Sequence, residues 1–320
     1  MRSAPVLIMA ASTQVFAQTD IANYPARPVR IIVPQSPGAS TDLTARLIAR
    51  LLSDAWRQPV VVDNRPGAGT IIGTELVVRA TPDGYTLLVV AAGITVNPSM
   101  YQRVPYDTGR DLAPVSQLTR FANMLAAHPS FAAKSLQELI TMAKARPNTI
   151  NYASAGLASG THMSMELLKT MTGIELVHIP YTGGGPAVTA VVGGQVPLNV
   201  GTTGGVLPHV RSGKLRALAV TTARRQAAAP DVPTFAESGV PGYDHGPWNG
   251  LFAPAKTPPA LLAKIHAEVG RALRAPEVQK VFSNEGVEAV ASKPEEFAAT
   301  VRAELRMWPK VVKAAGIKVQ

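Results

Sequence analysis

Short hydrophobic runs alternate with amphipathic segments along most of the chain, which is the pattern expected of an α/β protein. The first such unit begins with Val29 to Val33, an almost uninterrupted apolar run typical of a buried strand. A turn rich in Pro, Gly, Ser and Thr follows it, and then a segment whose apolar positions recur at helical spacing. We predict a strand, a loop and a helix, with the helix capped by Ser40, Thr41 or Asp42. The apolar face of this helix consists of Leu43, Leu47, Ile48 and Leu51.

The same succession of strand, small-residue loop and helix recurs further along the chain. The strand predicted at Ile150 to Ala153 runs into a loop from Ser154 to Thr161 and a helix from His162 to Met171. The strand predicted at Leu176 to Ile179 runs into the loop Tyr181 to Gly185 and a further helix. The first N–H groups of a helix have no intrahelical partner and attract anions. If the sheets are parallel, these loops share an edge and form a candidate site for a carboxylate or phosphate.

Two strands of similar character are each followed by a proline and a helix, and we interpret them as two crossings between structural units. They are Phe121 to Ala127 and Trp248 to Ala253. Gly201 to Gly205, which includes Thr202, follows another predicted strand and belongs to the same set of loops. The other predicted strands are Val60 to Val62, Tyr85 to Val90, Val196 to Val200 and Leu215 to Val220. The other predicted helices are Ile71 to Arg79, one that opens at Ser135, Pro258 to Leu273, Pro276 to Asn284 and Pro294 to Ala315.

The composition indicates one large or two medium α/β domains. The chain has 320 residues, of which 46% are hydrophobic, and this is enough to build sizeable cores. Cysteine is absent, which excludes disulfides, thiol nucleophiles and cysteine metal sites. The formal charge is +10, but the 31 Lys and Arg residues are spread along the chain without a basic run or interleaved aromatic residues. This distribution argues against nucleic acid as a partner, and a small anionic ligand, or no particular partner, explains the charge better.

The N-terminus has the features of a secretory signal. Arg2 precedes an apolar run from Ala4 to Ala11, and Val15-Phe16-Ala17 fits the small-residue rule for cleavage. We therefore predict that residues 1–17 are a signal peptide and that the protein is exported. No other stretch of the sequence reaches the ~18 uninterrupted apolar residues that a membrane span needs.

The sequence offers no group of residues suited to catalysis. A GxSxG elbow, an HExxH motif and paired carboxylates near a candidate loop are all absent, and the six His residues are dispersed. His162 and Glu166 are four residues apart on a helix but lack a third ligand nearby, so we expect no metal site and no cofactor. The sequence therefore favours a binding protein over an enzyme.

Two alternatives remain open. Gly67, Gly69 and Gly73 form a GxGxxxG series between a strand and a helix, which allows an α/β enzyme that binds a nucleotide cofactor through the Gly67–Gly69 loop. The series departs from GxGxxG and follows the second strand, so close packing of the backbone is the better interpretation. The other alternative is a periplasmic interaction module without a ligand.

The motifs together resemble the Bug (Bordetella uptake) family, the periplasmic solute-binding proteins of tripartite tricarboxylate transporters. The resemblance covers essentially all of the chain after the signal segment, with the motifs in order. They are Tyr24-Pro25, PVRIIVP from Pro28, PGASTD from Pro37, DNRPGAG from Asp63, TPDGYTLL from Thr81, NPSMY from Asn97, INYASAG from Ile150, HIPYTGGGPA from His178, LPHVRSGKLRALAV from Leu207 and the strand Trp248 to Pro254.

The resemblance implies a type II periplasmic binding-protein fold, in which two α/β domains are joined by two crossing strands and the ligand cleft lies between them. On this basis domain 1 comprises residues 18–121 and 247–320, and domain 2 comprises residues 122–246. It also implies a small organic carboxylate as ligand, such as a di- or tricarboxylate, an aromatic carboxylate or an amino acid. The implied partners are the membrane permease of such a transporter or a sensor kinase, and the receptor is expected to be a monomer.

In relatives the first βα loop and ordered waters hold the ligand carboxylate, so Gly38 to Asp42 would form the clamp of domain 1. Gly156 to His162 and Tyr181 to Gly185 would face it from domain 2. The family usually has PFPPGG where this chain has Pro34 to Ala39, so Gln35 and Ser36 bring side chains that relatives lack. An acidic residue common after GGQV is replaced here by Pro197. The candidate ligand-binding residues are Ser36, Gly38, Ala39, Ser40, Thr41, Asp42, Ala92, Ser154, Gly156, Ser159, Thr161, His162, Tyr181, Gly183, Gly184 and Thr202.

Overall fold

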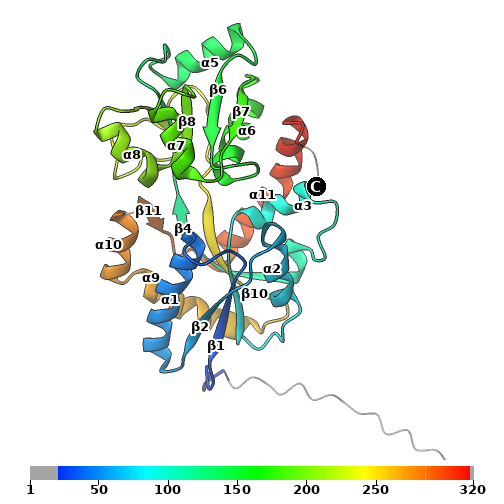
Figure 1. The fold of residues 1–320 in the computed structure, drawn as a ribbon. Coiled ribbons are helices and arrows are strands. Elements are labelled where there is room, and N and C mark those ends of the chain that lie inside the picture. Colours follow the sequence, from blue (N-terminus) through cyan, green and yellow to red (C-terminus); the bar gives the residue numbers. More distant parts are fainter. Residues whose placement is uncertain (1–20, 285, 318–320) are drawn as a thin grey trace, which may run out of the picture.

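Two β-sheets organise the chain into two α/β lobes, seen one above the other in Figure 1. The computed structural model describes residues 21–284 and 286–317, so the predicted signal peptide at residues 1–17 lies outside the described residues. Among the helices within those two ranges, none is long and apolar enough to cross a membrane.

The first lobe is built on a six-stranded mixed sheet with the strand order β11-β4-β10-β3-β1-β2. β1 pairs in parallel with β2 and β3, while β10 runs antiparallel to β3 and β4. Helices cover both faces, so β10 is buried along its whole length and β1 at every position except Arg30. The strands are β1 (Val29–Val33), β2 (Val60–Asn64), β3 (Thr86–Ala91), β4 (Leu112–Phe121), β10 (Trp248–Pro254) and β11 (Val287–Ala289).

Successive residues of these strands point into two separate cores, one on each face of the sheet. On one face, α1, α9 and α10 contribute Ile48, Ile265 and Phe282. On the other face, α2, α3 and α11 pack around Trp248 and Phe252. The helical segments of this lobe are α1 (Ser40–Trp56), η1 (Ala68–Thr70), α2 (Ile71–Val78), α3 (Gly93–Met100), α4 (Thr108–Asp111), α9 (Pro259–Leu273), α10 (Pro276–Asn284) and α11 (Pro294–Ala314).

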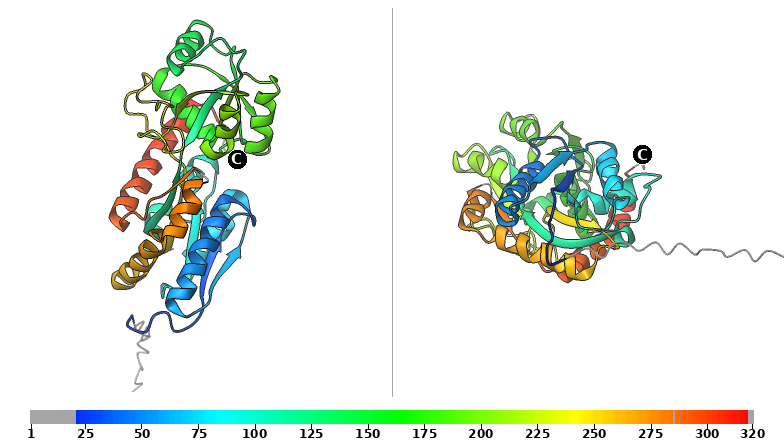
Figure 2. Two further views of the ribbon diagram at one scale, coloured as in Figure 1. Left: turned by 90° about the vertical axis from the view of Figure 1, so that its left-hand side faces the viewer. Right: turned by 90° about the horizontal axis from the view of Figure 1, so that it is seen from below.

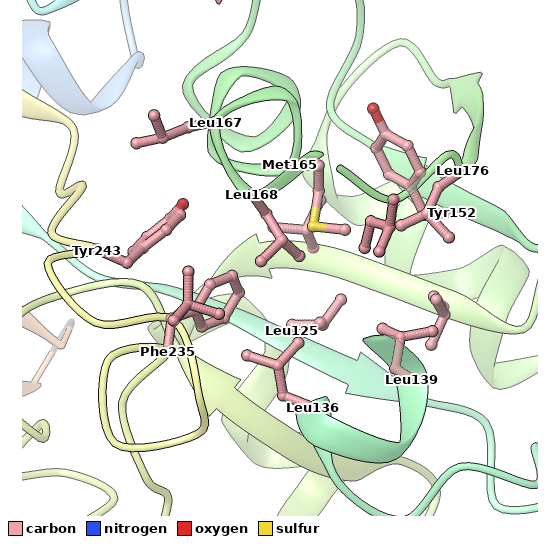
Figure 3. Packing of buried hydrophobic residues seen from close by; sticks show 14 of the residues in the cluster. Leu125, Leu136, Leu139, Tyr152, Met165, Leu167, Leu168, Leu176, Phe235 and Tyr243 are labelled. Carbon is pink, nitrogen blue, oxygen red and sulfur yellow. The ribbon is translucent and has the colours of Figure 1, made fainter. Parts of the chain in front are cut away.

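The second lobe is built on a five-stranded sheet with the order β7-β6-β8-β5-β9. β6 pairs in parallel with β7 and β8, and β5 is antiparallel to β8 and β9. Its core, shown in Figure 3, gathers Leu125 from β5, Leu139 and Leu168 from two helices, and Phe235 and Tyr243 from the irregular segment before β10. The elements are β5 (Asn123–Ala127), α5 (Leu136–Ala145), β6 (Asn151–Ser154), α6 (Gly160–Thr172), β7 (Val177–Pro180), α7 (Gly184–Val192), β8 (Leu198–Thr202), α8 (Thr203–Arg211) and β9 (Arg216–Val220).

The chain passes between the lobes at two adjacent places. β4 leads through Ala122 into β5, and the segment 244–247 leads back into β10. The two passages are hydrogen-bonded to each other, because the backbone N–H of Phe121 donates to the carbonyl of Pro247 at 2.8 Å. In Figure 1, β4 lies at the junction of the lobes.

Helix α11 makes a third connection, because it contributes to the cores of both lobes. Its first half places Phe297 and Val301 against the first sheet, and its second half places Trp308 and Val312 in the core of the second lobe. Figure 2 shows the helix running from one lobe to the other. Any motion of the lobes relative to each other must therefore move or bend α11.

A buried carboxyl group, Glu304, ties α11 to this junction. It accepts hydrogen bonds from the indole N–H of Trp248 at 2.8 Å and from the hydroxyl of Thr95 at 2.7 Å. Burial raises the pKa of Glu304, and these hydrogen bonds offset only part of that effect. The folded state therefore holds a proton on Glu304 more tightly than the unfolded chain does.

We expect Glu304→Gln to become progressively more stable than the native protein as the pH rises above 4.5, the ordinary pKa of this carboxyl group. The raised pKa means that the native protein loses stability as the pH rises through it, and a neutral amide removes this loss. The amide can keep both contacts, because its N–H can donate to Thr95, whose hydroxyl also donates to the carbonyl of Ala92 at 2.7 Å. Urea unfolding at several pH values measures the difference. Glu295→Gln, at an exposed position on the same helix, should show no such trend, and a constant difference for Glu304→Gln would contradict the prediction.

Most of the elements predicted from the sequence are present, but three predictions are wrong. The residue that caps α1 is Ala39, with no side-chain cap. The strand predicted from Phe121 to Ala127 is interrupted at Ala122 and extends back to Leu112. Leu43, which belongs to the predicted apolar face of α1, is 59% exposed.

The four-residue helix α4 was not predicted, and neither were two longer helices, α3 and α8. Each contains an internal proline, Pro98 in α3 and Pro208 in α8, together with glycine in the first turn or turns. These residues disfavour a helix when it is isolated. Both helices pack against a sheet through buried residues such as Ile94 and Val206, so tertiary packing overrides local propensity.

Candidate functional site

A cavity of about 620 Å³ lies between the two lobes. This volume is within the range of small-molecule sites in proteins, roughly 300–1,000 Å³. Its polar lining comes from both lobes and from the crossing strands, so its shape depends on how the lobes are placed. The polar residues that line it are Ser40, Thr44, Asn123, Ser159, Thr161, Thr202 and Asn249.

Three helices begin at this cavity. Ser40 is the first residue of α1, Ser159 caps α6, and Thr202 precedes α8 as its cap. α1 and α6 follow the carboxyl ends of β1 and β6, strands that pair in parallel with their neighbours, and α8 follows β8. The positive ends of three helix dipoles therefore meet at one place without any basic side chain.

Several backbone N–H groups at these helix starts have no acceptor among the described residues. The first intrahelical bond of α1 runs from Leu43 to Ala39, which leaves the N–H group of Ser40, a residue of the cavity lining, without an intrahelical acceptor. In α6 the hydroxyl of Ser159 accepts one backbone N–H, that of His162 at 3.2 Å, so the N–H groups of Gly160 and Thr161 are available. Such groups are suited to an anionic oxygen.

The start of α8 lies close to the first lobe. The position of an added Cβ on Gly286, just before β11, is 3.3 Å from the backbone nitrogen of Gly204. The hydroxyl and N–H of Thr203 both donate to the carbonyl of Ala122, at 3.0 and 2.9 Å. The lobes therefore touch at α8, and of this helix start Thr202 is the part that lines the cavity.

Asp42 supports the first loop from below instead of facing the cavity. Its buried carboxylate accepts from the N–H of Gly38 at 2.9 Å, the amide of Asn64 at 2.9 Å and the guanidinium of Arg46 at 3.0 Å. Burial by itself would raise the pKa of Asp42, but these hydrogen bonds outweigh it and hold the pKa below its ordinary value. The negative charge is thus used to hold the loop and is not presented to a ligand.

Thr41 holds the start of α1 against the crossing strand β10. Its hydroxyl donates to the amide oxygen of Asn249 at 2.8 Å, and the amide nitrogen of Asn249 donates to the hydroxyl of Thr44 at 3.1 Å. Thr41 is fully buried. The helix that supplies the first-lobe amides is therefore fixed directly to one of the two passages between lobes.

The loop before α6 rests on two stacked imidazole rings. His162 accepts from the N–H of Ala158 at 3.1 Å and stacks on His178 with ring centroids 3.9 Å apart. His178 is hydrogen-bonded to the hydroxyl of Ser154 at 2.6 Å. Burial, together with the neighbouring His162, lowers the pKa of His178 to about 4, so it is neutral at physiological pH. The stack supports the loop from Ser154 to Ser159 from below.

Glu166 lies under the same stack and is the buried negative charge of the second lobe. It accepts from the hydroxyl of Tyr152 at 2.7 Å and from the ammonium group of Lys169 at 3.0 Å, and it lies 3.5 Å from His162. In the described part of the chain no group of three His, Cys, Asp or Glu side chains is placed to hold a metal ion. The pair His162 and Glu166 is thus buried, and His162 caps the loop by accepting from the N–H of Ala158.

The structure brings only some of the predicted site residues to the cavity. Ser40, Ser159, Thr161 and Thr202 line it. Four others lie beneath the loops as described, namely Thr41, Asp42, Ser154 and His162. The remaining candidates are not part of its lining, and these are Ser36, Gly38, Ala39, Ala92, Gly156, Tyr181, Gly183 and Gly184. Tyr181 and Gly183 lie in the loop after β7, and Gly184 is the first residue of α7. Because β7 is an edge strand, this loop lies at the edge of the second sheet.

Residues that the sequence did not single out complete the lining. Asn123 and Asn249 lie on the two passages between lobes, and each is buried in a polar network. Val281 and Phe282 come from α10, more than 200 residues from α1 in sequence. An asparagine in an otherwise apolar predicted crossing strand is the signal that could have identified Asn123 and Asn249.

The glycine series after β2 is used for packing. An added Cβ on Gly73 would lie 2.7 Å from the side chain of Pro34 and 2.7 Å from the carbonyl oxygen of Arg65. An added Cβ on Gly69 would meet the hydroxyl of Tyr101 at 2.3 Å. These contacts account for the glycines without a nucleotide.

The sequence and the fold both match known proteins. The model of the tripartite tricarboxylate transporter family receptors matches residues 44–317. Protein BugT of Bordetella pertussis is 38% identical over 315 residues, which covers 98% of this chain and 97% of BugT. A Rhodopseudomonas palustris protein solved with adipate is 35% identical, with a TM-score of 0.76 over 93% of this chain and 100% of that one. MatC of the same organism, solved with malate, is 33% identical, with a TM-score of 0.73 over 90% of this chain and 100% of MatC.

Proposed function

The chain belongs to the Bug family of receptors of tripartite tricarboxylate transporters, and from that premise we propose that the cavity between its lobes holds the carboxylate group of its solute. It has the two-domain periplasmic binding-protein fold and is a periplasmic carboxylate-binding receptor. The observation that supports this site is the meeting of the α1, α6 and α8 N-termini at one cavity.

The energetics of this arrangement suit a carboxylate. A hydrogen bond to a charged group contributes about 1.5–3 kcal/mol, and a helix N-terminus adds roughly 0.3–1 kcal/mol. The available N–H groups of Ser40 in one lobe, and of Gly160 and Thr161 in the other, supply several such contacts. A carboxylate bound by both sets stabilises the closed arrangement of the lobes, which is the state that a transporter must recognise.

The remaining parts of the proposal concern how the receptor works. It is delivered by a signal peptide at residues 1–17, acts as a monomer without catalytic activity, and hands its ligand to membrane permease subunits or reports it to a sensor kinase. Its domains are residues 18–121 with 247–320, and residues 122–246. The helix α11, which packs in both lobes, belongs to domain 1 in this division.

The test is to remove one backbone N–H at the cavity. Ser40 is the first residue of α1, where proline is tolerated, and Ala39 before it has φ −67° and ψ 156°, a conformation that a following proline allows. We expect Ser40→Pro to weaken binding of the best-bound carboxylate by roughly 10- to 100-fold, the value of one hydrogen bond to a charged group. Isothermal titration against mono-, di- and tricarboxylates first identifies that ligand.

Ser40→Ala is the matched control, because it removes the hydroxyl but keeps the N–H. A similar loss for both variants would assign the effect to the side chain and contradict the role of the backbone. A correctly folded protein that binds none of the carboxylates would contradict the proposed function itself.

A further inference from the structure

One side of the cavity, which we call the apolar wall, is formed by aliphatic and aromatic side chains. α1 contributes Leu43 and Leu47, α10 contributes Val281 and Phe282, and β11 contributes Val287. Leu43 is 59% exposed and Val281 is 47% exposed, although each lies beside other apolar side chains. These two residues therefore present apolar surface to the cavity and to solvent at its mouth.

The polar groups lie mainly where the helices begin. Ser40 comes from the start of α1, Ser159 and Thr161 from the start of α6, and Thr202 from the position before α8. Thr44, Asn123 and Asn249 also line the cavity, but their side chains are hydrogen-bonded within the protein. Among the described residues that line the cavity there is no Lys, Arg, His, Asp or Glu. The lining can therefore neutralise one anionic group where the helices begin, and it offers no partner for a second charge along the apolar wall.

We propose that the solute has a single carboxylate and an apolar body, aromatic or alkyl, which packs between α1 and α10. This specificity rests on the proposed function, because it assigns the carboxylate to the helix N-termini. The apolar body covers the exposed faces of Leu43 and Val281, and the hydrophobic effect then adds to affinity. A second carboxylate at the other end of the solute would lie against the apolar wall. It would lose its bound water there and gain no hydrogen bond or opposite charge in return.

Two ligands of equal chain length test this directly. Hexanoate and adipate differ by one terminal carboxylate, so isothermal titration of the native protein with both isolates the effect of the second charge. We expect hexanoate, and phenylacetate as the aromatic probe, to bind at least tenfold more tightly than adipate, malate or citrate. Tighter binding of adipate, malate or citrate would overturn the inference and leave the carboxylate receptor intact, whereas no binding of any of them would remove both.

The apolar wall is tested by a double variant, Leu43→Ser with Val281→Ser. Both positions are substantially exposed, so the fold should persist. Phenylacetate should bind roughly tenfold more weakly, which corresponds to about 1.4 kcal/mol. Leu76→Ser, at a position on α2 that is 46% exposed and outside this cavity, is the control and should leave affinity unchanged. Unchanged phenylacetate affinity in a folded double variant would overturn the inference.

Discussion

Replacing Gly160 with alanine is expected to weaken carboxylate binding roughly tenfold or more while both lobes stay folded. Gly160 is the first residue of α6, and an added Cβ would lie 2.7 Å from Cγ and 3.1 Å from Cβ of Pro247. The ring of Pro247 is rigid, and the backbone carbonyl of Pro247 accepts a hydrogen bond from the N–H of Phe121. Pro247 therefore cannot easily move away from the added methyl group. The start of α6 must therefore move away from the passage between the lobes.

Such a movement separates the two sets of N–H groups that act on one carboxylate. A shift of several tenths of an ångström at α6 lengthens the contacts from Gly160 and Thr161, while Ser40 remains attached to the first lobe. Hydrogen bonds weaken steeply with distance and angle, and each one to a charged group is worth about 1.5–3 kcal/mol. Losing one of them gives at least the tenfold change.

Gly270→Ala is the matched control for the glycine change. Gly270 lies in helix α9, and its added Cβ would approach only the guanidinium end of Arg274, at 3.2 Å, a flexible group that can move aside. Both changes exchange glycine for alanine in a helix, which by itself favours the helix. Titration calorimetry and urea unfolding separate affinity from stability. Unaltered affinity in a folded Gly160→Ala protein would show that the position of α6 does not control binding.

The sequence predicts the βα units well because their signals are local. A continuous apolar run such as Val29 to Val33, followed by small residues and a helical repeat, specifies strand, loop and helix together. The rule that loops gather at the carboxyl ends of parallel strands then brings Ser40, Ser159, Thr161 and Thr202 to one region. These four residues do line one cavity.

What the sequence does not reveal is the direction in which each loop side chain points. Asp42 is a good capping residue by type, yet its carboxylate turns back to Gly38 and Asn64, and Ala39 becomes the cap. His162 similarly turns under its loop to stack on His178. Asn64 is 22 residues from Asp42, and His178 is 16 residues from His162. The periodic pattern of a single helix or strand contains no information about such distant partners.

The apolar wall shows the same limit at longer range. Leu43 satisfies the helical spacing of a core residue, but it is 59% exposed and lines the cavity together with residues of α10. Whether a leucine at such a position is core or cavity depends on which other elements pack against that part of the helix. The periodic pattern of one segment does not contain that information.

Replacing Glu166 with glutamine is expected to destabilise the protein by about 3 kcal/mol at pH 7. Burial alone would raise the pKa of Glu166, but hydrogen bonds from His162, Tyr152 and Lys169 outweigh it and lower the pKa from 4.5 to about 2. The side chain of Glu166 is only 3% exposed, so solvent screens these contacts weakly. A glutamine keeps the contact with Tyr152 but leaves the largely buried ammonium group of Lys169 without its main counter-charge.

The pH dependence distinguishes this ionic role from simple packing. Because the pKa is lower in the folded state, the stabilisation is complete above pH 4.5 and is lost as the pH falls toward 2. The difference in unfolding free energy between the native protein and Glu166→Gln should therefore shrink over that interval in urea titrations. Glu175→Gln removes a 54% exposed carboxylate 3.8 Å from the same lysine, and it should cost less than about 1 kcal/mol. If the Glu166→Gln difference stays constant down to pH 2, the loss comes from packing and not from the buried charge.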